Sequence, residues 1–359
     1  MRIGSDARHA PWPTKMSAAE QVDEAARRGL EGLFFRTMLD MSPTLDPGQL
    51  REIRARIDGH GMYLESGLGK VNTYALPETP EVRALGDGDT LLGFRRMMEA
   101  AAAIGITELW VSTAGLKRYG GRLAYDRFRT DVSWSDQLVA IEKFLQKLAP
   151  IARDLGVHLN AETHEEITSF ELVRLVEAIG PDVMGITFDT GNPLHRAEHP
   201  TLVAQRVAPY VRQTHLKDFA LFFDPKGLLR QSRPLGHGVV DLRAVLPILM
   251  AVNPDLNLSL EAAESTGGPR PNFERPATPI ALYDPEWIAG HPDLTVPELA
   301  DYLSLVQRFA DRVAEGSAGS WEEFDQRPYD LEEAWAWIGQ SLEHLHTVLD
   351  EIGSLEGTK

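Results

Sequence analysis

The chain has 359 residues, of which 43% are hydrophobic and 25% are charged, so its composition is that of a globular protein and not of a disordered one. It contains no cysteine, which excludes disulfides, cysteine nucleophiles and zinc sites built from thiolates. A formal net charge of −17, with no basic run, argues against nucleic acid as a partner.

The N-terminal residues MRIGSDARHA lack the apolar core of a signal peptide. Elsewhere the chain has no uninterrupted apolar segment of about eighteen residues, the length that a membrane-spanning helix needs. We therefore expect a cytoplasmic protein with no membrane partner.

Eight short runs of apolar or β-branched residues alternate with helical patterns along the chain. Repeated strand and helix units form a parallel sheet, and eight such units close it into a barrel. The sequence therefore predicts an α/β protein with a (β/α)8 TIM barrel. The eight predicted strands lie near residues 2–5, 32–36, 61–67, 106–113, 157–162, 183–189, 211–217 and 256–261.

Helix starts can be recognised between these strands. Ser17 with Glu20 and Thr168 with Glu171 have the spacing of capping boxes, and Asp241 can cap the helix that follows it. The pattern after strand eight is different. Residues 262–294 are dense in Gly and Pro and predict a long irregular loop, which at such a length is usually functional.

A helix announced by Thr295 follows that loop, and residues 330–352 have the periodicity of one more amphipathic helix, capped by Asp330. We divide the chain into a barrel of residues 1–315, which includes the loop, and a C-terminal helical extension of residues 316–359. The extension is expected to pack on the barrel or against a partner.

Side chains that can bind a metal end the last four predicted strands. In a parallel barrel the C-terminal ends of the strands converge, so these groups should meet. Three carboxylates together would repel one another strongly unless a dication lay between them. Ordinary charged rim residues are the alternative. The predicted ligands of one divalent ion (Mn²⁺, Mg²⁺, Co²⁺ or Zn²⁺) are Glu162, Asp189, His215 and Glu261.

Four residues near the predicted metal are candidate catalytic groups: Glu162, Glu261, His164 and Lys217. For His164, a supporting role beside the ligands is as good an interpretation as catalysis. Lys217 follows His215 by two positions and should share its face of the strand, where it contacts substrate or forms a salt bridge with Asp218 or another acid.

Further candidates lie outside the ligand set. Asn192 either stabilises its loop or binds substrate. Tyr283 and Trp287, with His291, are predicted to form an aromatic wall for a planar leaving group, with packing of the long loop as the alternative. We interpret three other histidines as surface residues: His195, His199 and His237.

The segments AETHEE, ITFDTGN, THLKD, PLGHGVVD and LSLE, in this order and spacing, resemble the xylose-isomerase-like barrel superfamily of sugar isomerases and epimerases. The resemblance runs from residue 1 to residue 261 and into the following helix. It implies that the four predicted ligands bind one divalent metal, commonly manganese. It also implies that Glu162 and Glu261 exchange protons with the substrate from opposite faces.

The chain departs from the pattern in three respects. Ketose epimerases of this group often have a substrate-binding His where this chain has Asn192, and the related AP endonucleases hold three zinc ions with histidines that this chain lacks. The segment ALYDPEWIAGHPDLT is longer than compact isomerases carry. It resembles the large subunit of bacterial C-glycoside deglycosidases, which act on 3-oxo glycosides with a small β-sandwich partner.

These observations predict a metal-dependent enzyme that removes the proton next to the carbonyl of a sugar or 3-oxo glycoside. It would act as a lyase that expels an aglycone, or as an isomerase or epimerase. The non-enzymatic alternative is a carbohydrate-binding or assembly subunit. We expect a small-molecule sugar as substrate, a possible β-sandwich partner subunit and an oligomeric state.

Overall fold

The computed structural model describes residues 1–12, 15–115, 125–262, 277–326 and 330–356. Its centre is an eight-stranded parallel sheet in the order β10-β1-β2-β3-β4-β5-β6-β7. A parallel bridge between Leu216 and Leu260 joins the end of β7 to β10. The TIM-barrel prediction and all eight strand predictions are confirmed. The strands are β1 Ile3–Asp6, β2 Gly32–Phe34, β3 Tyr63–Lys70, β4 Glu108–Ser112, β5 His158–Glu162, β6 Met184–Asp189, β7 Val211–His215 and β10 Leu258–Leu260.

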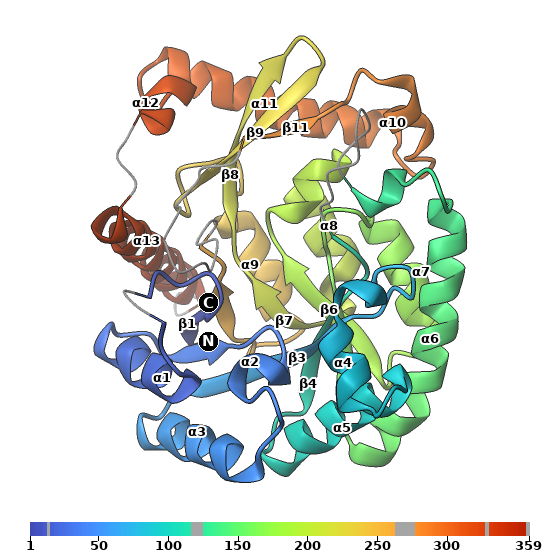
Figure 1. Cartoon of the computed structure of the whole chain (residues 1–359). Coiled ribbons are helices and arrows are strands. Elements are labelled where there is room, and N and C mark those ends of the chain that lie inside the picture. Colours follow the sequence, from blue (N-terminus) through green and yellow to red (C-terminus); the bar gives the residue numbers. More distant parts are fainter. Residues whose placement is uncertain (13–14, 116–124, 263–276, 327–329, 357–359) are drawn as a thin grey trace.

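Helices surround the barrel on the outside (Figure 1). The predicted caps at Ser17, Thr168, Asp241 and Thr295 all accept backbone N–H groups of the first helical turn. The α-helices are α1 Ala18–Arg27, α2 Met38–Met41, α3 Pro47–Gly59, α4 Pro80–Leu85, α5 Thr90–Ala103, α6 Trp134–Leu155, α7 Ser169–Ile179, α8 Pro200–Val207, α9 Leu242–Met250, α10 Pro285–Ala289, α11 Val296–Ala314, α12 Trp321–Asp325 and α13 Leu331–Glu356, and the short 3-10 helices are η1 Leu76–Glu78, η2 Asp126–Phe128, η3 Asn192–Arg196 and η4 Ala208–Tyr210.

A β-hairpin follows β7 where the sequence analysis placed no strand. It consists of β8 Asp218–Asp224 and β9 Gly227–Arg233, and β11 Ala277–Ile280 pairs with β9 in antiparallel fashion. Figure 1 shows this three-stranded sheet rising from the barrel toward α11. The predicted irregular loop of residues 262–294 is therefore wrong in part, because it contains β11 and α10. Its residues 263–276 lie outside the described part of the chain.

The C-terminal helix α13 packs on the barrel's own helices. Leu345 and Val348 are fully buried, and α13 contacts α9. Trp335 meets Trp12 edge to face at 5.9 Å, with Arg28 over the same Trp335 ring at 4.1 Å. Of the two predicted locations for this helix, the barrel surface is the one observed.

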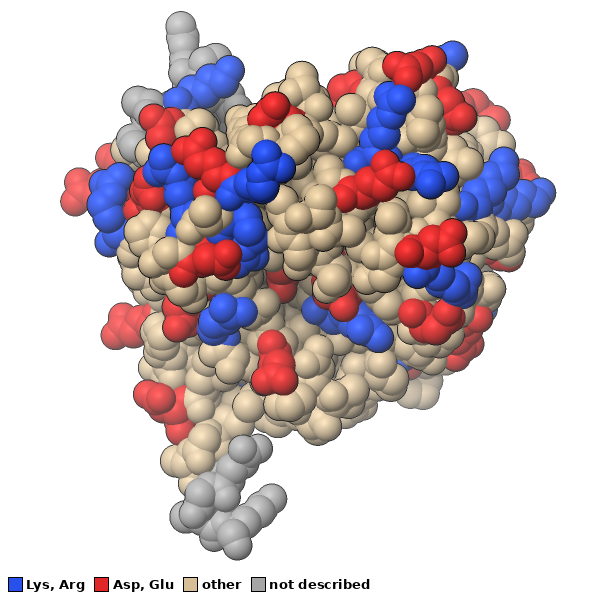
Figure 2. Space-filling view, turned by 90° about the horizontal axis from the view of Figure 1, so that it is seen from below, with Lys and Arg blue, Asp and Glu red and all other residues tan. Residues whose placement is uncertain are grey.

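Charged side chains of both signs occur together on the face of the molecule in Figure 2, where Lys and Arg are interspersed with Asp and Glu. Among the described helices, none combines the length and the apolar character that crossing a bilayer requires.

Asp218 holds the start of the hairpin to the loop before α9. Its carboxylate accepts backbone N–H groups from four residues, at 2.8 to 3.0 Å: Phe219, Gly236, Gly238 and Val240. Burial raises the pKa of Asp218 to about 7, while these donors act in the opposite direction. The predicted pairing of Lys217 with Asp218 is therefore replaced by backbone anchoring.

We expect Asp218→Asn to destabilise the fold by about 2 to 4 kcal/mol, because an amide NH2 would face N–H donors that then lose their acceptor. Urea unfolding followed by circular dichroism measures the change. Asp241→Asn is the matched control, since Asn caps a helix as well as Asp, and it should cost less than about 0.5 kcal/mol. Equal effects of the two substitutions would contradict the anchoring role.

Glu65 generates a second prediction, on pH. It is buried inside the barrel, with Asn257 Nδ2 donating to Oε1 at 2.8 Å and Oε2 unpartnered among the described residues. Burial raises the pKa of Glu65 from 4.5 to about 7. Between these values the folded protein holds a proton that the unfolded chain releases, so the free energy of unfolding falls as pH rises through this window.

In Glu65→Gln this titration is absent. Between pH 4.5 and pH 7 the wild-type protein should lose about 3 kcal/mol of unfolding free energy relative to the variant, as measured by urea unfolding in EDTA. Parallel pH profiles of the two proteins would show that Glu65 keeps an ordinary pKa.

Candidate metal and substrate site

The four predicted ligands meet at the C-terminal mouth of the barrel. Glu162 ends β5, Asp189 ends β6, His215 ends β7, and Glu261 directly follows β10. One ligand atom from each lies within 4.8 Å of the others. Three of the side chains are fully buried and Glu261 is 6% exposed, so the carboxylates share a desolvated space.

Hydrogen bonds fix the orientation of the ligands. His215 Nδ1 donates to Glu162 Oε1 at 2.9 Å, and Trp110 Nε1 donates to Glu162 Oε2 at 3.0 Å. Asp189 Oδ1 accepts the backbone N–H groups of Gly191 and Asn192, both at 2.8 Å. These bonds hold the carboxylates in place without satisfying every ligand atom.

Three buried ligand atoms have no hydrogen-bond partner among the described residues: Asp189 Oδ2, His215 Nε2 and Glu261 Oε2. Asp189 Oδ2 lies 3.1 Å from Lys217 Nζ as an ion pair, but without the geometry of a hydrogen bond. Buried polar atoms are normally hydrogen-bonded, so three converging ligands that each keep an atom without a hydrogen bond fit a cation. The donor set of carboxylates and one imidazole suits a divalent ion.

The net charge of the centre also favours a bound cation. Asp6 at the end of β1 adds a fourth buried carboxylate beside the ligands, and in the described part of the chain Arg36 and Lys217 are the Arg and Lys side chains paired with this group. With the histidines left out of the count, these four carboxylates and two cations leave a net charge of −2. One divalent cation would neutralise it.

Lys217 lies between β7 and β8 and points at the ligands. Its Nζ is 2.7 Å from Glu261 Oε1 and donates to Asn192 Oδ1 at 3.3 Å. Burial alone lowers the pKa of Lys217, but the carboxylates of Asp189 and Glu261 outweigh it, and the pKa is raised above its ordinary value. Of the predicted roles, the salt bridge with a rim acid is observed.

Asn192 is fully buried and close to the ligands. Its Nδ2 donates to Glu162 Oε1 at 3.4 Å, while its Oδ1 accepts from Lys217. Asn192 thus links a predicted ligand to a predicted catalytic cation, a closer involvement than loop stabilisation.

His164 lies in the loop after β5 and forms a dyad with Glu166. Its Nδ1 is 2.5 Å from Glu166 Oε2, Thr113 donates to the other oxygen of Glu166, and Nε2 lies 4.0 Å from Glu162 Oε2. Burial alone lowers the pKa of His164, but the carboxylates of Glu166 and Glu162 outweigh it and raise the pKa to about 9. His164 is therefore held with its second nitrogen toward the ligands.

The predicted aromatic wall is not observed as one surface. Tyr283 is 53% exposed, whereas Trp287 is 2% exposed and stacks on His291 with ring centroids 3.7 Å apart. Arg196 Nη1 donates to His291 Nε2 at 3.0 Å. Trp287 and His291 therefore have the packing role that was the alternative prediction.

Two of the three surface histidines were placed wrongly. His195 is fully buried in η3, where its ring lies 3.0 Å from Tyr125 Oη. His199 is half-buried and caps α8 by accepting the N–H of Thr201. His237 is exposed, as predicted. The buried contact of His195 joins residues 70 positions apart, which local sequence patterns do not reveal.

The sequence analysis missed three residues of the mouth: Asp6, His9 and Arg36. Asp6 ends β1 and Arg36 follows β2, so both obey the rule that strand ends carry the site. Applying that rule to the first two strands as well as the last four would have found them. His9 has no such signal, because it lies in a loop.

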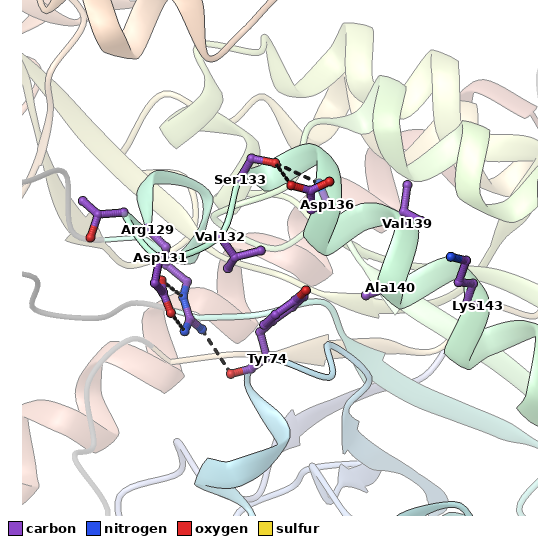
Figure 3. Close-up of a pocket in the computed structure, with 10 residues that line it drawn as sticks. Tyr74, Arg129, Asp131, Val132, Ser133, Asp136, Val139, Ala140 and Lys143 are labelled. Atoms are coloured by element: carbon purple, nitrogen blue, oxygen red, sulfur yellow. Dashed lines mark hydrogen bonds and ion pairs between the residues drawn. The ribbon is translucent and has the colours of Figure 1, made fainter.

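A groove in the described part of the molecule lies away from this site. It has a volume of about 820 Å³ and is lined by residues before and within α6, with Tyr74 on the opposite side (Figure 3). Arg129 and Asp131 pair with each other beside it. The groove contains none of the predicted site residues.

Comparison with known proteins agrees with the barrel fold. A family model described as a xylose isomerase-like TIM barrel matches residues 22–289. The chain is 31% identical over 103 residues to the uncharacterized protein YihM of Escherichia coli (strain K12), which covers 29% of this chain and 32% of that protein. It is 23% identical over 235 residues to 3-oxo-isoapionate decarboxylase of Pectobacterium atrosepticum, and this match covers 65% of this chain and 73% of that protein.

A further match, 27% identical over 77 residues, is to inosose dehydratase 1 of Bacillus cereus, covering 21% of this chain and 26% of that protein. The matched segments thus span about a third of the first relative and a quarter of the dehydratase.

Solved structures share the fold. The 3-keto-D-glucoside 4-epimerase of E. coli aligns with a TM-score of 0.55 at 15% identity, over 80% of this chain and 98% of its own. D-psicose 3-epimerase of Clostridium cellulolyticum H10 aligns with a TM-score of 0.58 at 12% identity, over 86% and 99%. The IolI protein with a bound zinc atom has a TM-score of 0.52 at 15% identity, over 89% and 100%. At these identities the similarity establishes the fold alone.

The geometry predicts that Mn²⁺ binds and stabilises the protein. At a free Mn²⁺ concentration of about 100 times Kd, the melting temperature should rise by about 3 to 4 °C, as measured by calorimetry with and without EDTA. Asp189→Asn keeps the Oδ1 acceptor for Gly191 and Asn192 but removes the charge, and should weaken Mn²⁺ binding by about 100-fold or more.

The matched control is Asp182→Asn, an exposed residue paired with Arg153 on the outside of the barrel. It should bind Mn²⁺ as the wild type does. The assignment of this centre would be contradicted if neither Mn²⁺ nor EDTA changed the melting temperature of the wild type. It would also be contradicted if Asp189→Asn bound Mn²⁺ with unchanged affinity.

Proposed function

The chain belongs to the xylose isomerase-like TIM barrel family, and on that premise we propose that it is a divalent-metal-dependent lyase acting on a 3-oxo sugar or glycoside. The observation that carries the proposal is the convergence of four buried ligands, three of which keep a buried atom without a hydrogen bond among the described residues. Such a centre suits chemistry in which negative charge develops on an oxygen of the substrate.

A bound divalent ion, for which we propose Mn²⁺, would supply Lewis acidity to a carbonyl oxygen beside the carbon that loses its proton. The holders would be Glu162, Asp189, His215 and Glu261. The names of the similar proteins support an oxidised carbohydrate as substrate class, since they include a 3-oxo-isoapionate decarboxylase and a 3-keto-D-glucoside 4-epimerase.

Glu162 is the carboxylate that we assign to proton removal. Its Oε2 accepts from Trp110 and faces His164 Nε2, whereas its Oε1 faces the other ligands. His164 is held by Glu166 through Nδ1, so its Nε2 is the atom that gives a proton to the leaving group. Lys217 adds a fixed positive charge beside the developing oxyanion.

Glu162 and His164 together account for both protons that move in the elimination. The C–H bond next to the carbonyl breaks and its proton goes to Glu162, a C=C double bond forms, and the bond to the β-substituent breaks with its electron pair. The departing aglycone takes the proton of His164. In a 3-oxo glycoside the C2 proton lies next to the carbonyl at C3, and the aglycone at C1 is the β-substituent that leaves.

The environment of Glu261 favours elimination over epimerisation. An epimerase needs a proton donor on each face of the substrate, and the resemblance assigns Glu261 to the second face. Here Glu261 Oε1 lies 2.5 Å from Arg36 and 2.7 Å from Lys217, while Oε2 is directed toward the other ligands. Glu261 Oε1 is thus held by two fixed cations, whereas Oε2 has no hydrogen-bond partner among the described residues, so our proposal assigns Glu261 to metal binding and not to proton transfer.

A sugar isomerase or epimerase is the second candidate, because solved epimerases share the fold. A carbohydrate-binding or assembly subunit is the third. The small β-sandwich partner subunit expected from the resemblance stays a prediction, as does an oligomeric state.

The deciding experiment incubates the Mn²⁺-loaded protein with phenyl 3-oxo-β-D-glucoside in D₂O. We expect release of phenol, detected by chromatography, and little deuterium at C2 of the recovered substrate. Glu162→Gln should lower kcat by about 100- to 10,000-fold, the usual contribution of a proton-transferring group.

Glu99→Gln, at an exposed position on α5, is the control and should keep wild-type turnover. Deuterium entering the substrate without loss of phenol would select the epimerase or isomerase instead. If deuterium exchange and phenol release are both absent, with this substrate and with free ketoses, the result would favour the carbohydrate-binding or assembly subunit.

A further inference from the structure

A second group of metal-ligating side chains lies beside the first and shares one member with it. Asp6, His9 and Glu261 each offer a ligand atom, and these atoms lie within 4.8 Å of one another. His9 Nδ1 is 3.5 Å from Asp6 Oδ1 and 3.3 Å from Glu261 Oε1. Glu261 uses Oε1 here, whereas its Oε2 faces His215 at 3.3 Å, so its carboxylate bridges the two groups.

This second group is already occupied by a side-chain cation. The guanidinium of Arg36 donates from Nε to Asp6 Oδ2 at 2.6 Å, and its Nη2 lies 2.5 Å from Glu261 Oε1 and 3.1 Å from His9 Nδ1. Arginine only donates, so His9 Nδ1 accepts, and it offers Arg36 the same lone pair that a metal would use.

The occupant is held rigidly. Arg36 is 8% exposed, and its guanidinium carbon lies 5.4 Å from the centre of the Trp110 ring. Asp6 is fully buried, and its Oδ1 accepts the backbone N–H groups of Arg8 at 2.7 Å and His9 at 3.1 Å. Asp6 therefore has two backbone donors besides Arg36, and Glu261 has an ion pair with Lys217 besides its contact with Arg36.

We propose that the Arg36 guanidinium takes the place of a second divalent ion, so that the native centre holds one metal and one fixed organic cation bridged by Glu261. The inference rests on the metal centre of the proposed function but not on its sugar chemistry. Its functional consequence is that the barrel lacks the paired metals with which two-metal enzymes hydrolyse phosphodiesters. The mononuclear centre suits a substrate that needs a single polarised oxygen.

The test counts metal ions. The wild-type protein and Arg36→Ala are freed of metal, loaded with Mn²⁺ and titrated by calorimetry, and the bound ions are counted by mass spectrometry. We expect one Mn²⁺ per chain in the wild type and two in Arg36→Ala. Electron paramagnetic resonance should show an isolated Mn²⁺ in the wild type and a spin-coupled pair in the variant.

Two further variants define the origin of the second ion. Arg36→Ala combined with His9→Ala should return to one ion, because the new site then lacks its nitrogen ligand. Lys217→Met removes the other cation that contacts Glu261 but leaves Asp6 and His9 as they are, and should keep one ion. Where Arg36→Ala fails to fold, Arg36→Gln retains most of the side-chain volume without the charge and should also bind two.

Other outcomes overturn the inference. A folded Arg36→Ala or Arg36→Gln variant with one ion or none, beside a wild type with one, overturns this inference alone and leaves the proposed lyase intact. A wild type that binds two ions also overturns it. A wild type that binds none overturns both this inference and the metal centre of the proposed function.

Discussion

The mutual repulsion of buried carboxylates at the barrel mouth is the constraint on which the site depends. Asp6, Glu162, Asp189 and Glu261 come from four strands and are taken out of water together, which is costly for each charge. The cations Arg36 and Lys217 offset half of that charge through close ion pairs. A compact divalent ion held by these ligands would offset the rest, so metal binding would also stabilise this end of the barrel.

The register of the barrel explains why the ligands converge. Side chains on a strand alternate between faces, so residues two apart point the same way, and parallel pairing sets Asp189 opposite His215. The residues two positions before each ligand therefore form the layer below, where Asn160 and Thr187 both bond to Gln213. Tyr63 bonds to Ser259 in the same layer. This hydrogen-bonded layer supports the ligands from beneath, because a side chain that shifted there would tilt the strand end above it.

The strand pattern and the four ligands were predictable because both depend on local rules: apolar runs of strand length, and chemistry at strand ends. Other features arise from contacts that no short window contains. His9 reaches Glu261 only when β1 and β10 lie side by side, and His195 contacts Tyr125, which lies 70 positions away in the sequence. The hairpin is a different case, since DFALFFDPKGLLRQSR has apolar strands around a Pro-Lys-Gly turn and was recognisable.

The four ligands distinguish this centre less than the side chains that contact the ligands do. Four ligands of this kind can serve isomerisation, epimerisation or elimination, because all three begin with the loss of a proton beside a carbonyl. The fate of the resulting carbanion depends on which atoms can return a proton, and in this chain Arg36 and Lys217 hold one oxygen of Glu261 while Glu166 directs His164. The proposed elimination uses Glu162 and His164 for proton transfer and leaves Glu261 as a ligand whose Oε1 is held by Arg36 and Lys217. In that proposal the division of roles favours the departure of a leaving group over the return of a proton through Glu261.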